Sequence, residues 1–455
     1  MNQTICAIST PHGIGGIAVA RVSGEQALNI VQKIWKGKHL EACPSHTAHL
    51  GTVSDTAGQP LDQAVVTIFR APRSFTGENT VEIAVHGSQY VQRELLNSLT
   101  KAGATLAGPG EFTRRAYLSG NLGLTEAEAV ADIIASTSKA AHRIAMNQMR
   151  GSVSAKLSQL HEQLLELASL LELELDFSEE DVEFASRQKL TDIATQIHSE
   201  VTRLHRSFAS GNAIKNGIPV ALIGETNAGK SSLLNTLVGD QKAIVSDIHG
   251  TTRDVIEDTV ELGDYLFRFM DTAGLRETTD EIEAIGIQRS HQAMQRAQII
   301  ILVADVTNPP APQTIEQIIS QTQPHQQLII VINKTDRQNP QTLINNLKAA
   351  VTPKIPIIPI SVATSDGINN LNAALIKSIE PESQQVTITN ARHAQALMLA
   401  SESITRVLDG LNNSLSGDLI ALDIRETLQH LASVTGNITS EDILQSIFSR
   451  FCIGK

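Results

Sequence analysis

The chain has 455 residues, of which 41% are apolar and 18% are charged, a composition that fits a globular protein of several domains and excludes a wholly disordered one. With 36 Lys and Arg against 48 Asp and Glu, the formal net charge is −12, so overall charge excludes a general binder of phosphate backbones, and any RNA contact must be local or come from a partner. Aromatic residues make up only 3%, which disfavours stacking platforms for bases.

Cysteine usage and the hydropathy pattern predict a cytoplasmic protein without a membrane partner. Cys6, Cys43 and Cys452 are too few and too far apart for a disulfide framework, which indicates a reducing compartment. Cys43, His46 and His49 have a spacing that metal ligands can use, but no fourth ligand lies nearby, so we expect ordinary loop residues. The N-terminus lacks a basic segment before an apolar core, and no apolar run is long enough for a membrane span.

The first 119 residues have the pattern of an α+β domain. Strand-like runs at 65–69 and 81–85 alternate with turns rich in Gly and Pro, and residues 91–101 resemble a helix. We therefore predict an N-terminal domain over residues 1–119.

The distribution of proline predicts two helical regions with a domain inserted between them. No proline occurs in 110–218 or in 382–455, and helix interiors exclude proline because it lacks the N–H and clashes with the preceding turn. Leucines recur at steps of three and four residues, which predicts an amphipathic helix; they are Leu157, Leu160, Leu164, Leu167 and Leu171. The sequence therefore predicts a discontinuous helical domain, residues 120–215 and 381–455, around an α/β domain at 216–380.

A phosphate-binding loop opens the inserted domain. Residues 218–223 have the pattern of a buried strand, 224–231 read G-x-x-x-x-G-K-S, and a helical run follows. In such a loop the backbone N–H groups and the helix N-terminus bind phosphate oxygens, Lys230 reaches the β- and γ-phosphates, and Ser231 ligates Mg²⁺. The predicted phosphate contacts are Asn227, Ala228, Gly229, Lys230, Ser231 and Ser232.

Two further segments fit the machinery of nucleotide hydrolysis. A D-T-A-G segment follows a strand-like run; its aspartate would hold the Mg²⁺ water shell, and its residues are Asp271, Thr272, Ala273 and Gly274. Upstream, residues 250–254 form a switch-like loop whose Thr would complete the Mg²⁺ coordination. Leu275 stands where Ras-like enzymes carry a water-orienting Gln, and no arginine finger is identifiable. Another polar group must therefore orient the attacking water. The nearest carboxylates belong to the acidic run Glu277, Asp280, Glu281 and Glu283.

The base-recognition segments select guanine. Asn333, Lys334 and Asp336 follow an apolar run, and a carboxylate at Asp336 can accept both the N1 and the N2 hydrogens of guanine, which adenine lacks. A later run, 355–360, leads into a last base-supporting loop with Ser361, Val362 and Ala363. Val362 departs from the usual Ser-Ala pair of that loop. The order of these segments predicts a GTP-binding domain.

The whole chain resembles one family, the MnmE (also TrmE) family of tRNA-modification GTPases. The resemblance rests on these segments: STPHGIGGIAVARVSG, SFTGENTVEIAVHG, PGEFTRRAYLSGNLGLTEAEAVADII, GETNAGKSSLLN, AIVSDIHGTTRD, DTAGLRETTDEIEAIGI and the terminal FCIGK.

The resemblance implies a potassium-activated GTPase that forms a homodimer through its N-terminal, folate-binding domain. With the partner MnmG, in a heterotetramer or larger complex, it would add a (carboxymethyl)aminomethyl group at C5 of the wobble uridine of certain tRNAs. The one-carbon donor would be 5,10-methylene- or 5-formyl-tetrahydrofolate.

The resemblance also implies roles for individual residues. The implied Mg²⁺ ligands are Ser231 and Thr252, and the implied K⁺ ligands are Asn227, Ser246, Ile248 and Thr251. The implied water-positioning carboxylate is Glu283. Ser246 stands where Thr is common. The GTP-contacting switch residues are Ser246, Asp247, Ile248, His249, Gly250, Thr251 and Thr252.

For folate, the resemblance implies Arg21, Glu82, Asn121 and the terminal Lys455, with Asn121 where most relatives have Lys or Arg. The terminal segment must then reach the first domain, and we expect it to do so across the dimer. Cys452 is a candidate for a chemical role.

Two other classes of protein share parts of this pattern. A regulatory GTPase of ribosome assembly has the same phosphate loop but usually adds a basic RNA-binding domain, whereas the flanks here are acidic or folate-domain-like. A GTP-dependent scaffold without one-carbon chemistry is the third reading. Nucleoside analysis of tRNA separates these alternatives.

Overall fold

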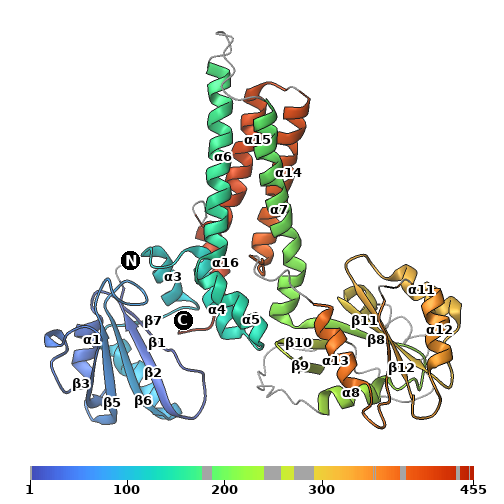
Figure 1. Ribbon diagram of the computed structural model, residues 1–455. Helices are drawn as coiled ribbons and strands as arrows, with labels where there is room; N and C mark the ends of the chain where they lie inside the picture. Colours follow the sequence, from blue (N-terminus) through green and yellow to red (C-terminus); the bar gives the residue numbers. More distant parts are fainter. Residues whose placement is uncertain are drawn as a thin grey trace. The chain divides into compact units, whose positions relative to one another are not determined.

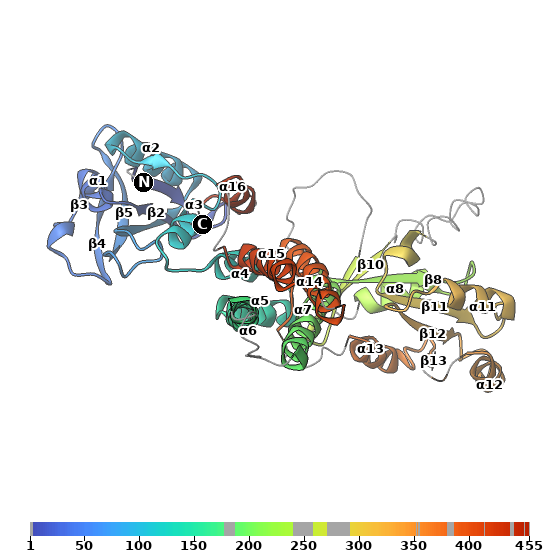
Figure 2. The same ribbon diagram turned by 90° about the horizontal axis from the view of Figure 1, so that it is seen from above.

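The computed structural model describes residues 3–176, 187–239, 258–270, 292–351, 353, 355–379, 386–413, 415–436, 441–449 and 451–454 (Figures 1 and 2). Contacts divide the chain into two compact units. The first contains Met1–Ile134, Asn147–His198 and Leu399–Lys455, and the second contains Ala135–Met146 and Ser199–Met398. The chain crosses between the units at four points, each of them within a helix, so the four-part division into domains stays a prediction.

The first unit begins with a seven-stranded sheet in the order β3-β4-β5-β6-β2-β1-β7. Neighbouring strands run antiparallel except for the parallel pair β1 and β7. The strands are β1 Ile5–Ile8, β2 Gly15–Ser23, β3 Trp35–Lys36, β4 Thr47–Ser54, β5 Pro60–Phe69, β6 Thr80–Gly87 and β7 Thr105–Leu106.

Helices α1, Ala27–Ile34, and α2, Gln89–Ala102, cover one face of this sheet and share a single apolar core with it. On the opposite face, Phe112 of helix α3, Glu111–Leu118, packs against β1. A short 3-10 helix, Leu40–Ala42, completes the domain. The predicted strands at 65–69 and 81–85 and the predicted helix at 91–101 are confirmed as parts of β5, β6 and α2.

The two proline-free regions are helical in their described parts. The first holds α3, then α4 Leu124–Ala135, α5 Lys139–Met149, α6 Ser152–Asp176 and α7 Arg187–Asn216; the second holds α14 Ala391–Asn412, α15 Gly417–Thr435 and α16 Glu441–Phe448. All five leucines of the predicted apolar stripe are buried along α6, and α6 and α15 run side by side (Figure 1). The prediction from proline and leucine spacing is therefore confirmed for these helices.

The C-terminal tail lies against the N-terminal domain of its own chain. Ile453 forms an antiparallel bridge with Pro109, and the hydroxyl of Ser9 donates to the carbonyl oxygen of Gly454 at 3.0 Å. The preceding helix, α16, packs through Phe448 against Leu124 of α4. The expectation that the tail reaches this domain across a dimer was therefore wrong for residues 451–454, because the same chain supplies the contact.

The second unit contains a six-stranded sheet in the order β13-β12-β11-β8-β10-β9, with β9 the antiparallel edge strand. Its strands are β8 Ile218–Ile223, β9 Asp258–Leu262, β10 Tyr265–Met270, β11 Ile299–Asp305, β12 Gln327–Asn333 and β13 Ile357–Pro359. The strands β8, β12 and β13 overlap predicted apolar runs, and β10 overlaps the strand-like run before the D-T-A-G segment. Parallel strands of this kind are apolar throughout because both faces of the sheet are covered.

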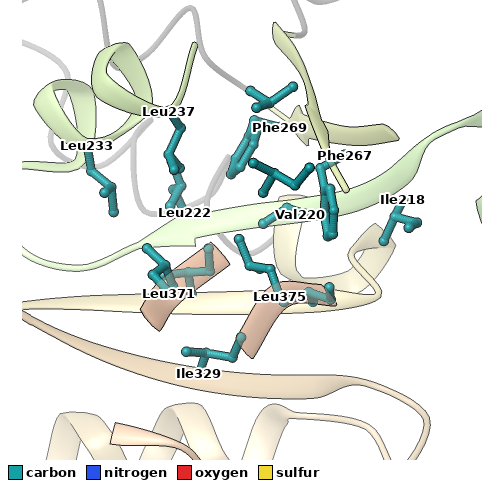
Figure 3. Packing of buried hydrophobic residues seen from close by; sticks show 14 of the residues in the cluster. Ile218, Val220, Leu222, Leu233, Leu237, Phe267, Phe269, Ile329, Leu371 and Leu375 are labelled. Atoms are coloured by element: carbon teal, nitrogen blue, oxygen red, sulfur yellow. The ribbon is translucent and has the colours of Figure 1, made fainter. Parts of the chain in front are cut away.

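Helices cover both faces of this sheet. Helices α8, Lys230–Gly239, and α13, Ile368–Lys377, lie on one face, where Leu233, Leu371 and Phe267 contribute to the core drawn in Figure 3. Helices α11, Pro312–Gln321, and α12, Gln341–Ala350, lie on the other. Loops at the carboxyl ends of β8, β11 and β12 therefore meet at one edge, the place where open α/β sheets bind ligands.

Within the described residues, no helix is both long enough and apolar enough to cross a membrane.

Candidate functional site

The phosphate loop joins β8 to α8, as its motif predicts. Two of its glycines are required by the backbone. Gly224 has φ 142 and Gly229 has φ 97, values that strain any residue with a Cβ. A Cβ at Gly224 would also collide with the carbonyl oxygen of Val303 in β11, and one at Gly229 with the side-chain amide of Asn333. The motif glycines therefore allow the loop to lie directly against β11 and the guanine loop.

Lys230 lies at the first turn of α8 with its ammonium folded onto the loop. The ammonium donates to the carbonyl oxygens of Gly224 and Glu225, both at 2.7 Å. Burial lowers the pKa of Lys230, and the nearby Glu225 carboxylate offsets only part of that effect. Phosphate oxygens are stronger acceptors for an ammonium than neutral carbonyls. A phosphate chain along this loop would therefore replace these carbonyl oxygens as the acceptor of the lysine ammonium.

The guanine-selecting carboxylate is held by the last loop of the domain. The hydroxyl of Ser361 donates to Oδ1 of Asp336 at 2.6 Å. This hydrogen bond is the main reason that the pKa of Asp336 lies below its usual value, so the side chain is an anionic acceptor at neutral pH. Thr335 ties the two loops together a second time, through a hydrogen bond from its hydroxyl to the carbonyl oxygen of Ile360 at 2.9 Å.

Asn333 links all three loops. Its amide nitrogen donates to the carbonyl oxygen of Ala228 at 2.9 Å, and its amide oxygen accepts from the backbone N–H of Val362 at 3.2 Å. The contact of Val362 uses the backbone, which is unaffected by the side chain. The departure from Ser-Ala at this position therefore leaves this hydrogen bond intact, and the exposed Ala363 follows in the same loop.

Several predicted residues lie outside the described residues. They are Ser246, Asp247, Ile248, His249, Gly250, Thr251 and Thr252 of the switch loop, Asp271, Thr272, Ala273, Gly274 and Leu275, the acidic run Glu277, Asp280, Glu281 and Glu283, and the terminal Lys455. Of the predicted magnesium ligands the structure describes only Ser231, and of the potassium ligands only Asn227. Ser231 is the second residue of α8, and Asn227 precedes the helix. Asn227 is exposed, with an amide oxygen of the kind that binds alkali cations. Ser232 follows Ser231 at the exposed start of the helix.

In the N-terminal domain, two of the predicted folate residues form one ion pair. Arg21 on β2 and Glu82 on β6 face each other in the strand register. The guanidinium donates to the Glu82 carboxylate through Nε at 3.0 Å and lies at 2.8 Å through Nη2. Both side chains are partly exposed, so the pair can meet a ligand on this face of the sheet.

Two aromatic rings that the motifs did not identify flank this pair. The Arg21 guanidinium carbon lies 5.4 Å from the ring centroid of Phe75 and 5.5 Å from that of Phe112. Cation–π contacts and stacking fix the plane of an arginine. Asn121 also belongs here, because its side-chain amide donates to the carbonyl oxygens of Ser74 and Phe75 at 3.0 and 3.3 Å.

Asn121 therefore positions the loop that carries Phe75. The C-terminal tail approaches the same region, because Gly454 lies against Ser9 and β1 pairs with β2. Cys452 is exposed in that tail, and its chemical role stays a prediction.

Comparisons with protein families cover nearly the whole chain. Residues 4–121 match the family described as the N-terminus of the GTP-binding protein TrmE, and residues 124–452 match the MnmE helical domain. Curated proteins named tRNA modification GTPase MnmE are similar over full length. The protein of Parabacteroides distasonis is 48% identical with 100% of both chains covered, and that of Christiangramia forsetii is 44% identical with the same coverage. The protein of Porphyromonas gingivalis is 47% identical and covers 100% of this chain and 98% of its own.

Solved structures are similar over part of the chain. Era, in complex with MgGDPNP and nucleotides of 16S ribosomal RNA, is 27% identical with 40% of this chain and 65% of its own covered, at a TM-score of 0.28. The G domain of the Thermotoga maritima (T. maritima) FeoB iron transporter is 25% identical with 36% and 99% covered, at a TM-score of 0.26. At these TM-scores neither structure adds to the assignment, which rests on the full-length relatives and on the family matches.

Proposed function

The chain belongs to the MnmE family of tRNA modification GTPases, and from that premise we propose that it uses potassium-activated GTP hydrolysis to modify the wobble uridine of certain tRNAs. The product would carry a (carboxymethyl)aminomethyl group at C5, made with the partner MnmG and a one-carbon tetrahydrofolate, either 5,10-methylene or 5-formyl. The observation that supports it best is the meeting of the phosphate loop and the guanine loop at one sheet edge, in a chain whose relatives match over their full length.

We also propose the division of labour along the chain. Residues 1–119 would bind folate and dimerise, residues 216–380 would form the inserted G domain, and residues 120–215 with 381–455 would form the helical domain. In the N-terminal domain, exposed apolar side chains in the loop before β2 and on strands β2, β4 and β5 support a homodimer, because contiguous exposed apolar patches mark interfaces. They are Ile14, 87% exposed, Ile17, 69%, Leu50, 66%, and Val65, 39%.

Two metal ions complete the proposed GTPase. Mg²⁺ would be held by Ser231 and Thr252, and K⁺ by Asn227, Ser246, Ile248 and Thr251. When bound, K⁺ would supply positive charge beside the phosphates, as an arginine finger does in other GTPases, where it stabilises the charge of the transition state. The chain's own part is to present oxygen ligands, and the exposed Asn227 amide fits that requirement.

The folate site leads to a binding prediction. An Arg21→Ala variant should lose the calorimetric signal for a reduced folate such as 5-formyltetrahydrofolate, because it removes the cation that lies between Phe75 and Phe112 and faces Glu82. Loss of one hydrogen bond to a charged group alone weakens binding by about 10- to 100-fold. Arg93→Ala is the matched control, since Arg93 is an exposed arginine on α2 that packs on Tyr90. Equal binding by wild type and Arg21→Ala would leave Arg21 as an ordinary surface residue.

The proposed function as a whole is tested by nucleoside analysis of tRNA from cells that lack the gene. We expect the modified wobble uridine to disappear and to return when the intact gene is restored. An unchanged nucleoside profile would favour the ribosome-assembly or scaffold alternatives over the modification enzyme.

A further inference from the structure

The guanine loop and the phosphate loop are joined by a side-chain bridge centred on one ammonium group. The ammonium of Lys334 donates to the carbonyl oxygen of Asn227 at 2.8 Å and to the carboxylate of Asp305 at 2.5 Å. Lys334 follows β12, Asn227 lies in the phosphate loop, and Asp305 is the last residue of β11. Three segments that are far apart in sequence therefore converge on Lys334.

The backbone at both ends of this bridge is strained. Asn227 has φ 64 and Lys334 has φ 65, in the left-handed region that residues with a Cβ rarely adopt. Such conformations persist only where surrounding contacts hold them, and they cluster at functional sites. The hydrogen bond from Lys334 to Asn227 connects the two strained residues directly, so the conformation of each supports that of the other.

Asp305 is itself fixed in orientation. The residue is 9% exposed, and its Oδ1 accepts from the backbone N–H of Thr307 at 2.9 Å and from the Thr307 hydroxyl at 2.7 Å. Oδ2 is thereby left for Lys334. Burial alone would raise the pKa of Asp305, but the hydrogen bonds from Lys334 and Thr307 outweigh it and hold the pKa below its usual value. The anchor for Lys334 is therefore an oriented carboxylate, anionic at neutral pH.

A neighbouring contact bridges the same two loops. The side-chain amide of Asn333 donates to the carbonyl oxygen of Ala228 at 2.9 Å, one residue beyond the carbonyl that Lys334 holds. This second bridge carries no charge, and its hydrogen bond does not use the Asp305 carboxylate, although Asn333 is the register partner of Asp305 on the neighbouring strand. Loss of Asp305 should therefore loosen Asn227 while the loop as a whole stays in place.

We propose that Asp305 is a positioning residue for the nucleotide site: its carboxylate anchors Lys334, which in turn holds Asn227 in the conformation that the phosphate loop needs. Guanine recognition and the phosphate end of the site would then share one charged link. The hydrogen bonds of Lys334 with Asn227 and Asp305 support the link between the loops. Its effect on potassium rests on the proposed function, in which the Asn227 side chain binds the ion.

A double-mutant cycle tests whether Asp305 acts through Lys334. Asp305→Asn keeps the shape of the side chain and removes its charge, and Lys334→Met keeps the chain length and removes the ammonium. Affinity for GDP is measured by calorimetry for wild type, both single variants and the double variant. We expect Asp305→Asn to weaken GDP binding about tenfold in the wild-type background, since hydrogen bonds to charged groups are the strong ones. In the Lys334→Met background the further loss should be under about twofold, because the two residues act as one unit.

The control is Asp264→Asn, which removes a second G-domain carboxylate that is paired with a lysine, at 3.1 Å from Lys139 and in the turn between β9 and β10. It should leave GDP affinity unchanged. Equal losses in the two Lys334 backgrounds would overturn the proposal, because Asp305 would then act on the fold alone. No loss in the wild-type background would overturn it as well.

Potassium supplies a separate measurement. Under the proposal, Asp305→Asn raises the K⁺ concentration that gives half-maximal GTP hydrolysis several-fold, and Asp264→Asn does not. A wild-type enzyme that is indifferent to K⁺ would contradict the proposed potassium role and leave the cycle on GDP affinity as the decisive result for Asp305. The failures of the two proposals are therefore distinguishable.

Discussion

An Asp336→Asn variant should exchange its preferred nucleotide from GTP to xanthosine triphosphate. The Asp336 carboxylate can accept the N1 and N2 hydrogens of guanine, whereas an asparagine there would donate to the C2 oxygen of xanthine and accept from its N1–H. Ser361 favours this outcome, because its hydroxyl, 2.6 Å from Oδ1 of Asp336, can donate equally well to an amide oxygen. The substituted side chain would then keep the orientation of the carboxylate and present its amide nitrogen to the base.

The expected size of the change follows from the chemistry of hydrogen-bonded selection. A site built to pair with a polar group rejects an analogue that lacks it by about 10⁴- to 10⁵-fold. Single-turnover hydrolysis of both nucleotides, compared between wild type and Asp336→Asn, gives the ratio. Asp366→Asn is the control, because Asp366 is an exposed carboxylate near the same loop that accepts from Thr364. A preference for GTP in Asp336→Asn by the wild-type margin would show that base recognition lies elsewhere.

Replacing potassium by sodium should strongly slow GTP hydrolysis. Leu275 cannot orient water and no arginine finger was identifiable in the sequence, so charge must come from another source, and an arginine finger contributes about 10³–10⁵ in rate. Under the proposal, the Asn227 amide and the other oxygen ligands would suit the larger ion and should hold Na⁺ poorly. Single-turnover hydrolysis in matched KCl and NaCl measures the effect. Equal rates in the two salts would remove the potassium role.

In the same assay, Glu283→Ala should abolish hydrolysis and leave nucleotide affinity near that of wild type. The proposed reason is that the carboxylate acts on the attacking water and not on the bound nucleotide, so its removal raises the barrier without weakening the ground state. Glu277→Ala, which removes an acidic neighbour in the same run, is the matched control and should hydrolyse normally. Near-normal hydrolysis by Glu283→Ala would exclude it as the water-positioning residue.

Local patterns were enough to predict most of the fold. The leucine spacing in α6, the proline-free regions and the strand–loop–helix order around Lys230 all depend on residues close together in the chain, and the structure confirms them. Boundaries were less well predicted. The apolar run 355–360 forms strand only at Ile357–Pro359, and Pro356 and Pro359 explain part of this because proline donates no hydrogen bond to a sheet.

Contacts between distant segments were not predictable from motifs. Phe75 and Phe112 flank Arg21, and Asp305 anchors Lys334, yet in each case the partners are separated by dozens of residues. One signal was available for Asp305: an acidic residue ends an otherwise apolar strand at the carboxyl edge of a parallel sheet, where ligands bind. The tail was placed on the wrong copy of the chain because sequence alone does not show which domain lies within its reach.

We expect nucleotide hydrolysis at this site to drive tRNA modification. The most direct test adds purified wild type or Asp336→Asn to a desalted extract of cells that lack the gene, with unmodified tRNA, a one-carbon tetrahydrofolate and either GTP or xanthosine triphosphate. Formation of the modified wobble uridine is measured by mass spectrometry of the digested tRNA. We expect modification by wild type with GTP and by Asp336→Asn with xanthosine triphosphate, and little in the crossed combinations. Equal modification by Asp336→Asn with either nucleotide, or without any, would contradict this expectation.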